Sequence, residues 1–202
     1  TMDVVVATRN NGKMKEIVAF DIPSVIFTSL DAYPEIGEIE ETGATFTENA
    51  LIKARYVCTV SGLPALADDS GLVIDALNGE PGVYSARYGN CATDDDRCRL
   101  VLSKMINVPW DKRTARFICV MALVFPDGKE YIEEGICHGF IATRPAGDNG
   151  FGYDPIFYLP YFDKTMAQLP LSVKNTISHR AKALQKVKNL LQTMVRQKSH
   201  EQ

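Results

Sequence analysis

Two short runs of the sequence place carboxylates among small residues that allow the backbone to turn. One is ADDSGL at residues 67–72, and the other is GFGYDP at residues 150–155. Adjacent carboxylates such as Asp68 and Asp69 repel each other unless a cation lies against them, and hard cations such as Mg²⁺ prefer oxygen ligands. The pair therefore predicts a divalent-cation site, with a solvated acidic turn as the alternative.

The same pair suits the hydrolysis of a phosphoanhydride. A carboxylate can orient a water molecule and accept its proton, and a carboxylate can also bind the metal. Glu40 and Glu41, in an acidic loop over residues 33–43, could supply further oxygen ligands. These four carboxylates are accordingly candidates for metal binding and general base catalysis.

A third run, TRNNGK at residues 8–13, lies between a short apolar run and a helical pattern. Backbone N–H groups at the start of a helix favour an anion, and Lys13 adds a positive charge there. The run lacks the spacing of a Walker loop. It predicts either a phosphate-binding loop or a plain turn between a strand and a helix.

Basic side chains elsewhere could complete a nucleotide site. Lys53, Lys174 and Arg180 could neutralise a polyphosphate, although a single basic side chain is more often a surface charge. His179, at the start of the last expected helix, could hydrogen-bond a base or a phosphate, or could equally cap the helix or pack.

The GFGYDP run also offers aromatic rings that could stack on a base. Phe151 and Tyr153 lie on either side of Gly152. Aromatic rings beside glycine more often belong to the core, so both interpretations stay open.

The composition is that of an ordinary soluble globular protein. The chain has 202 residues, of which 46% are hydrophobic and 23% charged, and its formal net charge is −3. This length suits one domain, which we place at residues 1–196, followed by a tail at 197–202 that we expect to fray. The acidic balance argues against nucleic-acid binding, and no apolar stretch reaches the roughly 18 residues of a membrane helix. Five cysteines without a C-x-x-C pair indicate reduced thiols in a cytoplasmic protein.

Hydrophobic periodicity predicts an α/β order of elements. We expect strands at 3–8, 25–28, 66–77, 114–125 and 129–141, and helices at 13–18, 45–58, 94–106 and 178–195. Thr45 and Glu48 have the spacing of a capping box at the start of the second helix. The last two strands, joined by Pro-Asp-Gly, indicate a hairpin. The Asp-Asp-Ser-Gly segment is expected to interrupt its strand as a turn, which would place the aspartates at a strand edge.

Together these segments closely resemble the inosine triphosphate/xanthosine triphosphate pyrophosphatase family of enzymes for noncanonical purine nucleotides. The resemblance runs from Val4 to about Leu191 and rests on T-x-N-x-x-K, ADDSGL, G-x-YSAR, GFGYDP and SHR in this order. It departs at Arg9, where many relatives carry a small residue. It implies an α/β fold in which an elongated mixed sheet and flanking helices form two lobes around a central active-site cleft, usually in a homodimer.

The resemblance also implies an activity and a role for each matching residue. The activity is Mg²⁺-dependent hydrolysis of ITP, dITP and XTP to the monophosphate and pyrophosphate, by attack of water on the α-phosphorus, which keeps these nucleotides out of DNA and RNA. Asp69 corresponds to the general base and a metal ligand, Glu41 to the other metal ligand and Asp68 to an auxiliary carboxylate. The implied phosphate-binding residues are Thr8, Asn10, Lys13, Lys53 and Ser70, with Arg9, Asn11 and Gly12 in the same substrate-binding loop. The implied nucleoside-binding residues are Phe151, Gly152, Tyr153, Asp154, Lys174, His179 and Arg180.

Two other functions fit parts of this pattern. A non-catalytic nucleotide sensor would keep the pocket and lack the acidic residues, whereas Glu41, Asp68 and Asp69 are all present. A Maf-type pyrophosphatase would share the general architecture and act on other nucleotides, whereas GFGYDP and SHR favour the purine enzymes. Hydrogen-bond donors aimed at a 6-oxo group would select hypoxanthine and xanthine over adenine.

Overall fold

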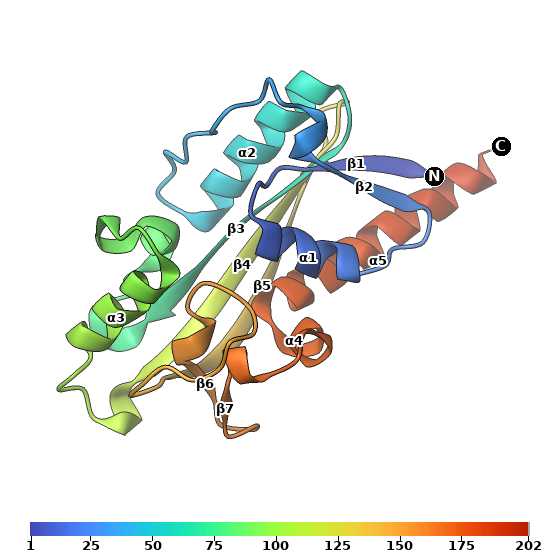
Figure 1. Ribbon diagram of the computed structural model, residues 1–202. Coiled ribbons are helices and arrows are strands. Elements are labelled where there is room, and N and C mark those ends of the chain that lie inside the picture. The colour runs from blue at the N-terminus through green and yellow to red at the C-terminus, as the bar shows by residue number, and fades with distance from the viewer. Residues whose placement is uncertain (202) are drawn as a thin grey trace. The chain divides into compact units, whose positions relative to one another are not determined.

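The computed structural model describes residues 1–201 and contains a seven-stranded mixed sheet in the order β2-β1-β3-β4-β5-β6-β7 (Figure 1). The strands are Met2–Val6 (β1), Val25–Ser29 (β2), Ala65–Ile74 (β3), Thr114–Val124 (β4), Glu130–Ile141 (β5), Phe157–Leu159 (β6) and Lys164–Thr165 (β7). β1 pairs in parallel with β2 and β3, and β6 pairs antiparallel with β5 and β7. The predicted α/β class and mixed sheet are confirmed.

The predicted helices are all present, and a further short helix at 171–177 was not predicted. They are Asn11–Ala19 (α1), Phe46–Ser61 (α2), Asp94–Lys104 (α3), Leu171–Ile177 (α4) and His179–His200 (α5). The predicted tail at 197–202 continues α5 as far as His200, and Gln202 lies outside the described residues. Over residues 1–201, no helix is both long and apolar enough to cross a membrane, and all five cysteines are free thiols.

The chain divides into two compact units, each with its own apolar core. The first unit holds Thr1–Asp69, Cys119–Gly135 and Arg180–Gln202, and the second holds Ser70–Ile118 and Ile136–His179. Strands β3, β4 and β5 each supply residues to both units.

The first unit opens with β1, α1 and β2 in sequence, which is the strand, turn and helix that the TRNNGK run predicts (Figure 1). α1 begins where it does because the Asn10 side chain accepts the Lys13 N–H at 3.0 Å and so caps the helix. β1 and α5 pack apolar side chains into one core, with Leu184, Val187 and Leu191 at helical spacing on α5. This core fixes the strand ends that carry the candidate residues.

α2 begins at a cap that differs in one detail from the predicted capping box. The Thr45 hydroxyl accepts the Glu48 N–H at 3.1 Å, as predicted. The Glu48 carboxylate instead accepts the N–H of Ala44 at 2.7 Å, one residue before the capping residue. The helix is therefore tied to the end of the loop that precedes it.

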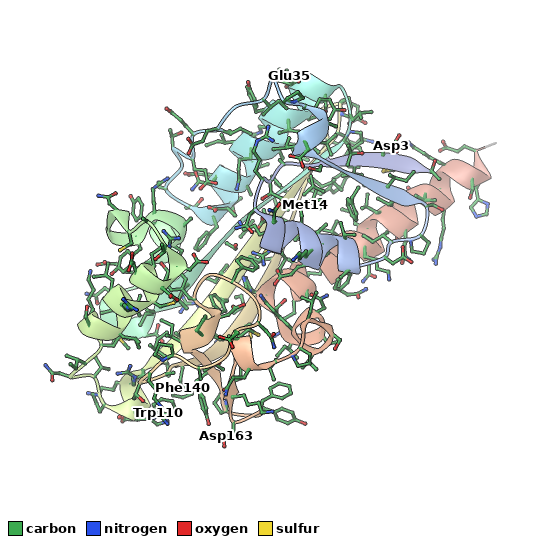
Figure 2. All side chains as sticks on the ribbon, viewed as in Figure 1. Asp3, Met14, Glu35, Trp110, Phe140 and Asp163 are labelled. Carbon is green, nitrogen blue, oxygen red and sulfur yellow. The ribbon has the colours of Figure 1, made fainter. Side chains whose placement is uncertain are left out.

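In the second unit, a buried arginine holds the ends of two strands. The Arg113 guanidinium donates to the carbonyl oxygens of Ile141 and Met105 at 2.7 Å and of Ala142 at 2.9 Å. Nearby, Trp110 stacks on Phe140 with ring centroids 5.3 Å apart (Figure 2). Arg113 therefore satisfies backbone carbonyls and serves the fold.

The prediction that the Asp-Asp-Ser-Gly segment forms a turn at a strand edge is wrong. β3 runs without interruption from Ala65 to Ile74, and of its ten residues only Ser70 is not fully buried. A strand buried on both faces needs apolar side chains or charges with partners, and Asp68 meets the second condition through Lys13 and Arg180.

Candidate active site

Asp68, on β3, lies buried against two cations. Its Oδ2 is 3.1 Å from Lys13 Nζ and 3.4 Å from Arg180 Nη2. Burial alone would raise the pKa of Asp68, but Lys13, Arg180 and Lys53 hold the pKa well below its ordinary value. The Asp68 side chain is therefore ionised. Its carboxylate pairs with Lys13 and Arg180, and the charge of Lys53 stabilises it further.

Arg180 is itself held by a second carboxylate. Its guanidinium forms an ion pair with Glu16 of α1 as well as with Asp68, and all three side chains are almost completely buried. The resemblance assigns Arg180 to the nucleoside pocket, whereas these contacts give it a supporting role beneath Asp68. Glu16 was not among the predicted site residues, although a glutamate among the apolar positions of a short helix is a signal for it.

Asp69, the next residue on β3, has a different environment. It is 4% exposed, and its Oδ2 has no hydrogen-bond partner among residues 1–201. Burial and Glu41 raise the pKa of Asp69 to about 6, although Lys53, Lys13 and the Asn49 amide lower it. A carboxyl with this pKa and an open oxygen is suited to accept a proton near neutral pH.

This environment predicts that Asp69→Asn stabilises the metal-free protein. Because the pKa of Asp69 is raised on folding from 3.8 to about 6, its ionisation opposes folding, and the penalty grows as the pH rises through this range. At pH 7.5 without Mg²⁺, the variant should unfold with a free energy roughly 1–3 kcal/mol higher than wild type. Urea titrations should show this gain at pH 7.5 and a much smaller one at pH 4.5, where the wild-type carboxyl is protonated. An equal gain in the free energy of unfolding at both pH values would contradict the raised pKa of Asp69.

Lys53, on α2, connects the aspartates to the acidic loop over residues 33–43. Its Nζ donates to the carbonyl oxygen of Asp68 and lies 2.9 Å from Oε1 of Glu41. Burial alone would lower the pKa of Lys53, but Asp68, Glu41 and Asp69 raise it above its ordinary value. Lys53 therefore neutralises part of the negative charge that Asp68, Asp69 and Glu41 gather at this place.

The predicted phosphate loop is shaped by its own side chains. The Thr8 hydroxyl accepts the Asn10 N–H at 3.1 Å, and Lys13 is directed to Asp68. Arg9 is directed elsewhere, because its guanidinium donates to the Ile36 carbonyl oxygen at 2.6 Å. Asn11 and Gly12 form the first residues of α1.

The predicted metal ligands lie near each other but do not form a closed cluster. Among residues 1–201, no group of three or more acidic, histidine or cysteine side chains is arranged to hold a metal ion. Asp68 is engaged by Lys13 and Arg180, and Glu41 is paired with Lys53. The open Oδ2 of Asp69 and the Glu41 carboxylate fit a hard cation that would need further oxygens from its ligand or from water.

In the second unit, the GFGYDP loop is organised by Asp154. This buried carboxylate binds Lys174 Nζ at 2.6 Å and accepts the Phe151 N–H at 3.2 Å. Lys174 also lies 4.6 Å from the centre of the Phe151 ring. Gly150 is required here, because a Cβ would lie 2.1 Å from Oδ2 of Asp154. The contacts of Asp154 and Lys174 therefore hold in place the loop that carries Phe151.

Tyr153 belongs to the core of the second unit. Its hydroxyl donates to the Ser85 carbonyl oxygen at 2.6 Å, and its ring lies in the apolar core. The Gly152 N–H donates to Asp94 of α3 at 3.0 Å, and the Cys98 thiol lies 3.5 Å from the Gly152 carbonyl oxygen. Asp94 was not predicted as a site residue, and nothing in its local sequence separates it from the neighbouring aspartates.

His179 and Ser70 complete the predicted set. His179 is buried and stacks on Phe117, with ring centroids 4.7 Å apart and an interplanar angle of 18°. Ser70 follows Asp69 on β3 and is the partly exposed residue of that strand. The stacking fixes the plane of the imidazole ring.

Known proteins resemble this chain over nearly its whole length. The Ham1 family model matches residues 4–190. A dITP/XTP pyrophosphatase of Geobacter sulfurreducens is 51% identical over 191 residues, which cover 93% of this chain and 96% of the relative. One from Halalkalibacterium halodurans is 48% identical over 190 residues, which cover 91% and 95%.

Solved structures lead to the same family. A HAM1 protein from Coxiella burnetii superposes with a TM-score of 0.87 at 43% identity, covering 96% of this chain and 100% of that one. The Ham1 protein of Staphylococcus aureus superposes with a TM-score of 0.85 at 40% identity, covering 95% and 99%. Since both sequence and fold match over nearly the whole length, the chain belongs to the Ham1 family.

Proposed function

We propose that this chain is a dITP/XTP pyrophosphatase that hydrolyses ITP, dITP and XTP to the monophosphate and pyrophosphate. The relatives described above carry this name. The observation that supports it most is Asp69, a buried carboxylate with an open oxygen next to Lys53 and Glu41. Removal of these nucleotides from the pool would prevent their incorporation into DNA and RNA.

Asp69 is the proposed general base. In the metal-free protein, its pKa of about 6 leaves the carboxylate largely ionised at pH 7.5 and able to accept a proton from water. The open Oδ2 is the atom that would receive the proton. Asp68 differs, because two cations already occupy its Oδ2 and hold its pKa low.

Glu41 and Asp69 are the proposed ligands of Mg²⁺, with Asp68 as an auxiliary carboxylate. Bound Mg²⁺ would neutralise phosphate charge and position the substrate. The two carboxylates fit this ion because both offer the oxygen ligands that Mg²⁺ prefers. Lys53, paired with Glu41 at 2.9 Å, would exchange this partner for a substrate phosphate.

Each unit has its own proposed part in substrate binding. In the first unit, the residues proposed to bind the phosphates are Thr8, Asn10, Asn11, Gly12, Lys13 and Lys53. In the second unit, Ser70 is also proposed to bind the phosphates, and the residues proposed to bind the nucleoside are Phe151, Gly152, Asp154, Lys174 and His179. Phe151 offers its ring to the base, while Asp154 and Lys174 hold the loop that carries it. The homodimer, the cytoplasmic location and the active-site cleft that the resemblance implies stay predictions.

A panel of nucleoside triphosphates tests the proposal. With Mg²⁺, ITP, dITP and XTP should each release pyrophosphate with a kcat/KM at least about 100-fold higher than ATP, because a site with donors for a 6-oxo group leaves them unsatisfied by adenine. Chromatography should separate pyrophosphate from orthophosphate. Equal use of ATP and ITP would contradict the proposed substrate class.

A further inference from the structure

The acidic loop over residues 33–43 carries Glu41, and its first end is tied to the phosphate loop by Arg9. The Arg9 Nη2 donates to the carbonyl oxygens of Ile36 at 2.6 Å and of Tyr33 at 3.4 Å. The Ile36 side chain is buried, so the carbonyl that Arg9 binds belongs to an anchored residue. Arg9 also lies 3.5 Å from Asp31, but the Asp31 side chain is 88% exposed and this contact is weak.

The second end of the acidic loop is tied to α2 by Asn49. The Oδ1 of this fully buried asparagine accepts the Gly43 N–H at 2.7 Å. This bond orients the amide, and Nδ2 has no hydrogen-bond partner among residues 1–201. Asn49 thus holds the second end of the loop at α2.

Between these two ends, Glu41 is the loop residue that reaches the site, through Lys53. We propose that Arg9 and Asn49 are positioning residues that hold the two ends of the acidic loop and thereby keep Glu41 beside Lys53, where it can bind the cation. The inference rests on the proposed role of Glu41 as a Mg²⁺ ligand. It gives Arg9, the residue that departs from the family motif, a role in loop position in place of phosphate binding.

Hydrogen exchange of the substrate-free protein tests how the loop is held. In Arg9→Ala, backbone amides of residues 33–43 should exchange roughly tenfold faster, because the loop loses hydrogen bonds from a charged donor. Arg9→Lys should behave similarly, since lysine keeps the charge but lacks the planar fork that reaches two carbonyls. Asp31→Ala, which removes only the exposed contact, is the matched control and should exchange as wild type does. Unchanged exchange in Arg9→Ala would overturn the proposal.

Mg²⁺ affinity separates a positioning role from phosphate binding. Calorimetric titration of the substrate-free Arg9→Ala variant should show roughly fivefold weaker Mg²⁺ binding than wild type, while the KM for ITP at saturating Mg²⁺ changes by less than about twofold. A raised KM with wild-type Mg²⁺ affinity, restored by Arg9→Lys, would show that Arg9 binds phosphate and would overturn the proposal.

The second end of the loop needs a variant that does not disturb a buried asparagine. A Cβ at Gly43 would lie 2.6 Å from the Glu48 Cβ and 2.7 Å from Asn49 Oδ1, so Gly43→Ala should displace this end. It should show the same faster exchange and weaker Mg²⁺ binding as Arg9→Ala. If Gly43→Ala exchanged faster in this loop but bound Mg²⁺ as wild type does, the proposal that Asn49 positions Glu41 through this end of the loop would be overturned.

Glu41→Gln distinguishes this inference from the proposed metal site. The variant should lose Mg²⁺ affinity while the amides of residues 33–43 keep wild-type exchange, because both loop ends are intact. If Glu41→Gln bound Mg²⁺ as wild type does, Glu41 would not be a ligand. The proposal that the loop holds Glu41 in place to bind the cation would then be overturned. The exchange rates of the Arg9 variants would still decide how the loop is held.

Discussion

Asp69→Asn should lower kcat for ITP by roughly 10²- to 10⁴-fold, the usual contribution of a positioned general base. The amide keeps the shape of the carboxyl on the buried strand β3, but it cannot accept a proton from water. Binding of ITP, measured by calorimetry on the inactive variant, should remain close to the wild-type KM. A variant that keeps more than about a tenth of the wild-type kcat would show that Asp69 is not the base.

Asp68→Asn is the matched control, because the same change is made one residue earlier on the same strand. Asp68 pairs with the partly buried Lys13 and the buried Arg180. In the variant, Lys13 would lose this carboxylate and Arg180 would keep only Glu16. This variant should therefore lose stability, whereas Asp69→Asn should gain it. If the two variants changed stability and turnover alike, the distinct roles assigned to the two aspartates would be wrong.

Arg180→Ala should lower the free energy of unfolding by about 3–5 kcal/mol, the usual cost of removing one partner of a buried ion pair. The loss follows because Glu16 and Asp68, both almost completely buried, would lose the guanidinium between them. Urea titration measures this directly. Arg116→Ala is the control: Arg116 lies 3.4 Å from Asp75 in an exposed pair, so its removal should change stability by less than about 1 kcal/mol.

The same variant bears on base selection. If Arg180 supports Asp68, Arg180→Ala should reduce kcat/KM for ITP and for ATP by similar factors. A selective loss on ITP would instead support the contact with the 6-oxo group that the family resemblance implies. The ratio of the two kcat/KM values is the quantity to compare.

Elements whose formation depends on residues close together in the sequence were predicted well. The Asn10 cap and the Thr45 cap each act within a few residues, so the start of α1 and of α2 follows from local chemistry. The apolar spacing of α5 depends only on its own helical period. The short strands β6 and β7 were not predicted, because two or three residues show no clear period.

The environment of the two aspartates could not be predicted locally. Asp-Asp-Ser-Gly has the composition of a turn, yet it lies within a buried strand, where the cations Lys13 and Arg180 neutralise Asp68. Arg180 lies 112 residues from Asp68 and 164 residues from Glu16 along the chain. The family motifs identified Asp68, Asp69 and Arg180, but only the fold shows that Arg180 and Asp68 bind each other.

The site of water attack tests the central claim most directly. In a single turnover of ITP with Mg²⁺ in ¹⁸O-water, the label should appear in inosine monophosphate and be absent from pyrophosphate, because the Asp69-activated water attacks the α-phosphorus. Mass spectrometry of the two products measures this. Label in pyrophosphate or orthophosphate, or inosine diphosphate as the first product, would contradict the account.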